Sequence, residues 1–222
     1  MNTGIHMLRT GLGVAFLALF SSLLSAAPAP AETQEYTAGK DYEVINPPQP
    51  TTDPSKVEVL EFFWYGCPHC YHFEPDLNAW LKTKPDNVVF IRQPAVFNER
   101  WAAHAKMFYT AEALGVLDKL HPQFYEAIQV KKLALASEDE QAKFFTEHGV
   151  TKDAFQKAYK SFAVDAKMRQ AEGMGARYGI SGTPTLVVNG KYRVSGSLAK
   201  SYPNMIAITN YLIAKESGKP AK

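Results

Sequence analysis

The chain has 222 residues, of which 46% are hydrophobic, 12% aromatic and 21% charged, enough apolar material for one domain of ordinary size, with or without an insertion. The formal net charge of +2 and the lack of a basic cluster argue against nucleic acid or an anionic surface as the main partner. The chain has two cysteines, Cys67 and Cys70, so any thiol chemistry depends on this pair.

The N-terminal segment, residues 1–31, is expected to be a secretory signal peptide. Arg9 precedes an apolar run, and small residues follow it. Ala29 and Ala31 form an A-x-A pattern, which predicts cleavage after Ala31. An uncleaved membrane anchor is the alternative, but the apolar run is short compared with the roughly 20 residues of a membrane span. Export would bring the cysteines into a compartment where disulfides persist.

Two apolar stretches in the first half of the remaining chain predict a parallel pair of strands. A short edge strand could form at Tyr42–Ile45, before a proline-rich connector. The stretch Val57–Trp64 is β-branched, aromatic and almost continuously apolar, which is typical of a strand buried on both faces. The next strand is expected at Asn87–Gln93. Because a helix is predicted between them, the two longer strands should be parallel.

That helix should begin at Cys67, directly after the break at Gly66. Pro68 suits the first turn, where its missing N–H has no partner to lose. Pro75 should kink the helix or end its first half.

Residues 98–178 contain no convincing strand and predict a helical insertion. Its helices carry recognisable start and stop residues. The expected helices begin at Asn98, after Pro122, at Ser137 (in a capping box with Glu140), at Thr151 and at Ser161.

The chain then returns to strands. Thr185–Val194 has two β-rich arms around Asn189-Gly190, the dipeptide that most strongly predicts a hairpin. A final amphipathic helix is expected from about Pro203 to Glu216.

Four kinds of site could use the sequence C-P-H-C. Covalent haem attachment needs a histidine after the second cysteine, where this chain has Tyr71. Zinc usually needs a second, separated pair of ligands, which the cysteines do not supply. A structural bridge between residues so close together would contribute little stability. The remaining interpretation is a catalytic dithiol at the start of a helix that follows a buried strand.

Helix geometry predicts different roles for the two cysteines. At the helix N-terminus, Cys67 meets unpaired backbone N–H groups and the positive end of the helix dipole, which lower the pKa of its thiol. Cys67 should therefore be the exposed nucleophile, and Cys70, one turn further in, its covered resolving partner. His69 could add positive charge near the sulfur, although it could also be an exposed spacer.

The stretches "FFWYGCPHCYHFE" and "GTPTLVVNGKYRVSG" resemble the DsbA family of periplasmic thiol:disulfide oxidoreductases. The resemblance implies an α/β protein, a thioredoxin fold with an inserted all-helical domain. The thioredoxin-like domain would comprise residues 32–97 and 179–222, and the helical insertion residues 98–178.

The resemblance also implies roles for individual residues. Cys67 would form the mixed disulfide with substrate and Cys70 would release it, with Pro68 and His69 tuning the thiolate. Thr183 and Pro184 would form a cis-proline loop that binds substrate, although sequence alone is equally compatible with an ordinary trans turn.

Two carboxylates are further candidates for tuning the thiolate. Glu61 lies among apolar residues, and burial would raise its pKa. It could be a buried proton acceptor for Cys70, as in similar proteins, or an edge residue facing solvent. Glu74, one helical turn past Cys70, could assist it or could belong to a solvated helix face.

The sequence thus predicts a periplasmic disulfide oxidase that acts on reduced, unfolded exported proteins and is reoxidised by a DsbB-like membrane protein. It should act as a monomer, without cofactor or metal, and without nucleic acid as a partner. A reductase or isomerase, and a chaperone in which the cysteine pair is incidental, are the alternatives.

Overall fold

The computed structural model describes Met1 and residues 35–218. The rest of the predicted signal peptide and its cleavage site after Ala31 lie outside the described residues. Among the described helices, none is both long and apolar enough to cross a membrane. The elements are β1 (Glu43–Val44), β2 (Val57–Phe63), α1 (Pro68–Leu81), β3 (Val88–Pro94), α2 (Glu99–Ala113), α3 (Leu117–Tyr125), the π-helix η1 (Glu126–Val130), α4 (Glu138–Glu147), α5 (Lys152–Tyr159), α6 (Phe162–Arg177), β4 (Thr185–Val188), β5 (Tyr192–Ser195), α7 (Gly196–Ala199) and α8 (Tyr202–Glu216).

The five described strands form one mixed sheet in the order β1-β5-β4-β2-β3. Strand β2 is buried along its whole length and lies parallel to β3, as the apolar pattern predicts. It is antiparallel to β4, which pairs in turn with β5. The hairpin turn holds Asn189 and Gly190 at φ of 52° and 65°, backbone angles that Asn and Gly tolerate best. The predicted hairpin and edge strand are both confirmed.

Alternation along β2 divides its side chains between the two faces of the sheet. Val57 and Val59 share a core with side chains from α1 and α8. Leu60 and Phe62 point to the opposite face, where they pack with residues from the end of α6. Glu61 follows the alternation of Val57 and Val59, so β2 places its carboxylate on the face that α1 covers.

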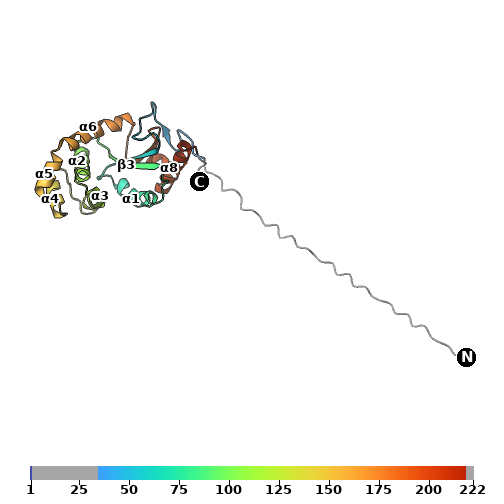
Figure 1. Cartoon of the computed structure of the whole chain (residues 1–222), viewed down its shortest axis with the longest axis horizontal. Helices are drawn as coiled ribbons and strands as arrows, with labels where there is room; N and C mark the ends of the chain where they lie inside the picture. The colour runs from blue at the N-terminus through green and yellow to red at the C-terminus, as the bar shows by residue number, and fades with distance from the viewer. Residues whose placement is uncertain (2–34, 219–222) are drawn as a thin grey trace. The chain divides into compact units, whose positions relative to one another are not determined.

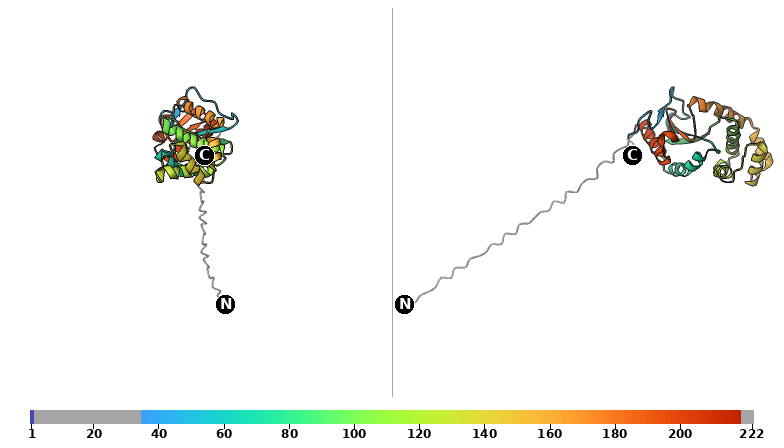
Figure 2. Two further views of the ribbon diagram at one scale, coloured as in Figure 1. Left: turned by 90° about the vertical axis from the view of Figure 1, so that its left-hand side faces the viewer. Right: turned by 180° about the vertical axis from the view of Figure 1, so that it is seen from behind.

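Helices α2 to α6 lie between β3 and β4 in the sequence and gather at the opposite end of the described body from β1 and α8 (Figures 1 and 2). The predicted caps are confirmed: Asn98, Ser137 and Thr151 each accept a hydrogen bond from a backbone N–H of the helix that they begin. Ser161, where a helix start was expected, caps α6 in the same way. The architecture is therefore α/β with an inserted run of helices, whereas the exact domain boundaries stay a prediction.

One helix boundary was predicted wrongly. Helix α3 begins at Leu117 rather than after Pro122, which lies inside it. A proline in the second turn costs only one backbone bond, the one to Asp118, and the apolar contacts of the helix keep it intact. Helix α1 likewise continues through Pro75 to Leu81.

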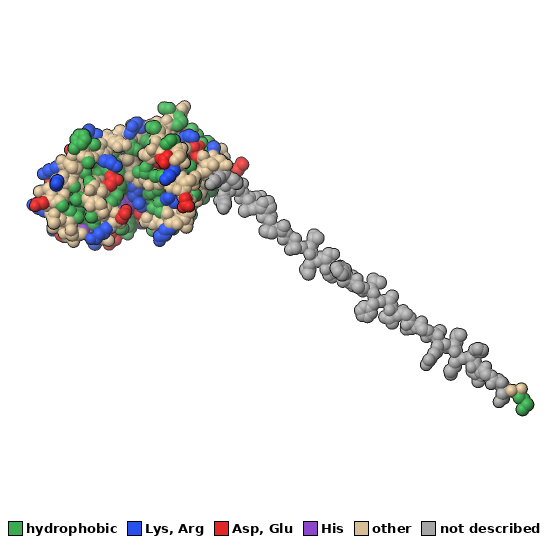
Figure 3. Space-filling model, viewed as in Figure 1, with side chains coloured by type: hydrophobic (Ala, Val, Ile, Leu, Met, Phe, Trp, Pro, Cys, Tyr) green, Lys and Arg blue, Asp and Glu red, His purple; other side chains and the backbone are tan. Residues whose placement is uncertain are grey.

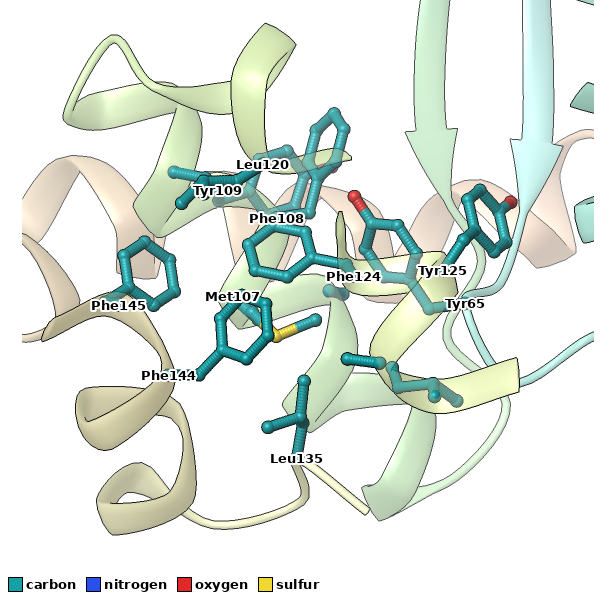
Figure 4. Close-up of a cluster of buried hydrophobic side chains, with 14 of the residues drawn as sticks. Tyr65, Met107, Phe108, Tyr109, Leu120, Phe124, Tyr125, Leu135, Phe144 and Phe145 are labelled. Atoms are coloured by element: carbon teal, nitrogen blue, oxygen red, sulfur yellow. The ribbon is translucent and has the colours of Figure 1, made fainter. Parts of the chain in front are cut away.

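The helical insertion has an aromatic core that reaches the cysteines. Figure 4 shows Tyr65 and Tyr125 beside Phe124 and Phe108 in this cluster. Cys67 and Cys70 belong to the same buried cluster. The thiols thus sit where the core of the inserted helices meets the end of strand β2.

Candidate active site

A tight turn between β2 and α1 places the two cysteines. Cys67 is the N-cap of α1, with extended backbone angles, and its N–H donates to the carbonyl of Trp64 at 2.9 Å. Pro68 is the first helical residue, as predicted. Gly66 is required in this turn, because a Cβ there would collide with the indole ring of Trp64.

Cys67 lies against the loop before β4. Its thiol donates a hydrogen bond to the carbonyl oxygen of Thr183 at 3.3 Å, and the Thr183–Pro184 peptide bond is cis, as expected. Cys67 is only 8% exposed, so the expectation of an exposed thiol was wrong: the cis-proline loop covers most of it. Cys70 is fully buried, as predicted from its place one turn further into the helix.

The environment moves the two thiol pKa values in opposite directions. The hydrogen bond from Cys70, helped by the backbone N–H groups of His69 and Cys70, lowers the pKa of Cys67 to about 5 despite its burial. Burial raises the pKa of Cys70 well above its ordinary value, and the neighbouring Cys67 raises it further. Near neutral pH the pair therefore holds one thiolate and one thiol, both cysteines being free in the structure.

His69 faces outward between the cysteines. Its Nδ1 lies 3.3 Å from the hydroxyl oxygen of Tyr202, at the start of α8. The backbone N–H of His69, hydrogen-bonded to the Cys67 sulfur, helps to lower the pKa of that thiol.

A groove of ≈ 740 Å³ opens beside Cys67. It is lined by His69, by the cis-proline loop with Thr183 and Pro184, and by Lys200 and Tyr202 from the α7–α8 region. Small residues, mostly serine and glycine, make up much of the rest of its wall. Elsewhere on the described surface, charges of both signs are interspersed over the face that Figure 3 shows.

Glu61 is buried near Cys70, whose pKa its charge helps to raise. Its side chain is fully buried, which contradicts the alternative of an edge residue facing solvent. Its Oε2 lies 3.4 Å from Nε of Arg92, the residue paired with it across the β2–β3 ladder. Neither carboxylate oxygen has a hydrogen-bond partner. Burial raises the pKa of Glu61 to about 8, against the opposing effect of the Arg92 charge.

Glu74 is largely buried as well, rather than on a solvated helix face. It contacts the guanidinium of Arg92 at 3.2 Å, Nε2 of His121 at 3.2 Å and the amide of Asn78 at 2.9 Å. Burial alone would raise its pKa, but the hydrogen bond from His121 and the charge of Arg92 outweigh burial and lower it. The two buried carboxyl groups therefore have pKa values shifted in opposite directions, with Arg92 between them.

Three residues of this buried side escaped the sequence reasoning: Tyr65, Arg92 and His121. Arg92 could have been found, because it is a charge inside an apolar strand that runs parallel to the strand of Glu61. His121 gives no such indication, since 47 positions separate it from Glu74 and only the packing of α3 against α1 brings them together. Among the described residues, no group of three or more His, Cys, Asp or Glu side chains is arranged to hold a metal ion.

The chain is similar to known proteins over most of its length. The family model of the DSBA-like thioredoxin domain matches residues 89–201. The thiol:disulfide interchange protein DsbA of Azotobacter vinelandii is 42% identical over 204 residues, 92% of this chain and 93% of the relative. The chain belongs to the DsbA family. The DsbA of Burkholderia cepacia is similar, 40% identical over 90% of this chain and 95% of its own length.

Solved DsbA structures agree with this assignment. The crystal structure of DsbA from Pseudomonas aeruginosa superposes with a TM-score of 0.79 at 42% identity, covering 82% of this chain and 95% of that one. The oxidoreductase DsbA from Xylella fastidiosa gives 0.76 at 34% identity, covering 82% and 98%. The thioredoxin fold with its helical insertion is thus confirmed, and this DsbA-family protein is a thiol:disulfide oxidoreductase.

Proposed function

We propose that this protein is a periplasmic disulfide oxidase, which donates its Cys67–Cys70 disulfide to reduced, newly exported proteins and is reoxidised by a DsbB-like membrane protein. The observation that carries the proposal is the separation of the two thiol pKa values, Cys67 at about 5 and Cys70 raised. A stabilised thiolate favours the reduced form of the enzyme, and that makes its disulfide a strong oxidant.

The exchange requires no electron carrier beyond the cysteines. A substrate thiolate attacks Cys67 Sγ of the enzyme disulfide, forming a mixed disulfide and releasing Cys70 as a thiolate. A second substrate thiolate then attacks the substrate sulfur, which forms the substrate disulfide and releases Cys67 as a thiolate. Two electrons pass from the substrate dithiol to the enzyme. The low pKa of Cys67 makes it a good leaving group in that second step.

Glu61 is assigned the proton transfer at Cys70. The released Cys70 thiolate has a raised pKa and needs a proton, and during reoxidation the Cys70 thiol must lose one. A buried carboxyl group whose pKa is about 8 can serve as the acid in the first case and the base in the second near neutral pH. Glu74 adjusts the pKa of Glu61, because it competes with Glu61 for the charge of Arg92.

Substrate binding is assigned to the groove beside Cys67. The Thr183–Pro184 loop forms its wall next to the reactive sulfur, where an extended substrate peptide could add as a strand against the backbone of Thr183. The protein is proposed to act as a monomer and without a cofactor.

The test is a redox titration of the Cys67–Cys70 pair against glutathione. The oxidase proposal expects equilibrium at a far more oxidising potential than that of structural disulfides, which lies below roughly −300 mV. It also expects the dithiol form to unfold at a higher temperature than the disulfide form. A potential as low as that of structural disulfides would overturn the proposal, whereas an intermediate potential with activity on scrambled proteins would favour an isomerase.

A further inference from the structure

A continuous chain of polar contacts runs under the active site from the helical insertion to strand β2. The hydroxyl of Tyr65 lies 2.7 Å from Nδ1 of His121, whose Nε2 lies 3.2 Å from Oε1 of Glu74. Glu74 contacts Arg92 at 3.2 Å, and Arg92 contacts Glu61 at 3.4 Å. The sequence of contacts therefore links α3 to the carboxyl group proposed to serve Cys70.

The two partners of His121 determine its state. Burial lowers the pKa of His121, which keeps the imidazole neutral near pH 7. Burial also raises the pKa of Tyr65 well above its ordinary value, so the phenol keeps its proton and donates to Nδ1. The imidazole proton is then on Nε2, from which it is donated to Glu74. Both ring nitrogens are satisfied in this single tautomer.

We propose that His121 is a positioning residue of the exchange site: its neutral imidazole holds Glu74 ionised and bound to Arg92, and so leaves Glu61 able to carry the exchangeable proton. The inference rests on the proposed proton-transfer role of Glu61. His121 touches neither cysteine and acts through Glu74 and Arg92.

One cation, Arg92, is shared between two carboxyl groups. Arg92 cannot give up its charge and lies within 3.4 Å of both Glu61 and Glu74. While the hydrogen bond from His121 keeps Glu74 ionised, Arg92 is shared and the negative charge of Glu74 opposes ionisation of Glu61. Without that hydrogen bond, burial favours protonation of Glu74, and Arg92 becomes free to stabilise the Glu61 carboxylate.

The surroundings of His121 hold this geometry in place. The side chain of Gln129, in η1, donates to the carbonyl of Tyr65 at 2.7 Å. Residues of the insertion thus form hydrogen bonds with both the backbone and the hydroxyl of Tyr65. The rings of Phe63 and Phe108 pack edge-on against the imidazole. The titratable or charged groups that act on His121 are Tyr65, Glu74 and Arg92 from other elements, and Asp118 and Tyr125 from α3 itself.

The direct test compares His121→Leu with His121→Gln in protein labelled with ¹³C at the glutamate carboxyl carbons. NMR titration of the dithiol form, assigned with Glu61→Gln and Glu74→Gln, gives the pKa of each carboxyl group. His121→Leu is expected to raise the pKa of Glu74 and to lower that of Glu61 by about one unit, a tenfold change in proton affinity. Glutamine offers one acceptor and one donor like the neutral imidazole, so His121→Gln should stay close to the wild type.

A second readout is the pH dependence of reoxidation by glutathione disulfide, whose midpoint should move to lower pH with the pKa of Glu61 in His121→Leu only. His104→Leu is the matched control, because it removes another buried histidine of the insertion that bonds a backbone carbonyl instead of a carboxylate. It should leave both carboxyl titrations unchanged. If His121→Leu fails to fold, Tyr65→Phe removes the donor to Nδ1 and should shift both pKa values in the same directions by less.

Unchanged titrations in a folded His121→Leu variant would overturn the inference, and so would equal shifts in His121→Leu and His121→Gln. Failure of the proposed function is distinguishable, because it would appear in the wild type as a low redox potential or as a reoxidation rate that does not depend on Glu61.

Discussion

The two sides of the cysteine pair present different chemical environments. On the groove side, Cys67 meets backbone N–H groups and the Thr183 carbonyl, and the groove next to the Thr183–Pro184 loop has a wall rich in serine and glycine. On the buried side, Cys70 has no exposed surface and lies near a network of ionisable groups that includes Glu61 and Arg92. Two thiols only three positions apart thus lie in different local environments.

This difference shows how one helical turn can separate two chemically identical groups. Hydrogen bonds to the ionised form dominate at Cys67 and lower the pKa of its thiol, whereas desolvation dominates at Cys70 and raises the pKa. In the proposed mechanism, Cys67 exchanges disulfides with the substrate on the groove side, and Glu61 transfers the proton of Cys70 on the buried side.

Replacing each cysteine by serine should break the comparison most completely. Cys67→Ser should reduce the oxidation of a reduced substrate protein to the uncatalysed rate, because no mixed disulfide can form. Cys70→Ser keeps the Cys67 thiol and a hydroxyl that can donate to it, but removes the group that resolves the mixed disulfide. Incubation with a disulfide-containing peptide should therefore trap a covalent adduct, visible by mass spectrometry, in Cys70→Ser alone.

An adduct in the Cys67→Ser variant instead would reverse the assignment of the two thiols. Oxidase activity in Cys67→Ser would remove the cysteine pair from the reaction and favour a chaperone.

Glu61→Gln should sharpen the contrast on the buried side. Loss of the proton carrier should slow reoxidation by about 10²-fold. The same change should alter the pH dependence of stability in the dithiol form. The pKa of Glu61 is about 8 in the folded protein against an ordinary value of 4.5, so its stabilising contribution is complete below pH 4.5 and is lost as the pH rises through 8.

Cys67 contributes with the opposite sign. Its pKa is about 5 when folded against an ordinary 9.0, so its contribution is complete above pH 9 and is lost as the pH falls through 5. Between pH 5 and 8 the melting temperature of Glu61→Gln should therefore rise more steeply with pH than that of the wild type. Glu58→Gln is the control: it changes a second buried carboxylate of β2, which bonds Thr52 instead of Arg92. A wild-type slope in Glu61→Gln would contradict the buried-acid assignment.

The smallest effect is expected on the groove side, from Tyr202→Phe. This change removes the hydroxyl that lies 3.3 Å from Nδ1 of the exposed His69 and keeps the ring. Since one neutral, solvent-exposed hydrogen bond contributes little, the equilibrium constant with glutathione should change no more than a few-fold, about 1 kcal/mol or less. A larger shift would mean that the imidazole of His69, and not only its backbone N–H, determines the stability of the Cys67 thiolate.

Local patterns predicted most of the fold correctly. The apolar run at Val57–Phe63, the Asn189-Gly190 turn and the Ser137–Glu140 capping box each depend on neighbouring residues, and each is found where it was expected. The start of α3 was predicted wrongly, because packing of its apolar face outweighs the local cost of Pro122.

For the site, too, local sequence predicted some features and missed others. The order Gly66, Cys67, Pro68 was enough to predict a thiol at a helix N-terminus, since the helix dipole and its free N–H groups follow from chain order alone. The resemblance to the DsbA family implied a Thr183–Pro184 loop at the site, but its cover over Cys67 was not predicted, because that contact joins segments 116 positions apart in the sequence.

By itself, the sequence determined the chemistry available: two thiols at a helix start, a carboxylate in a strand and a proline loop. Only the tertiary structure decided the protonation of the buried groups, Cys70 and Glu61, because desolvation and ion pairing depend on what surrounds a side chain in space. The folded chain buries Glu61 beside Arg92, brings His121 to Glu74 and closes the Thr183–Pro184 loop over Cys67. The turn at the start of α1 lowers the pKa of Cys67, and burial by distant segments raises that of Cys70, which together give one thiolate and one thiol.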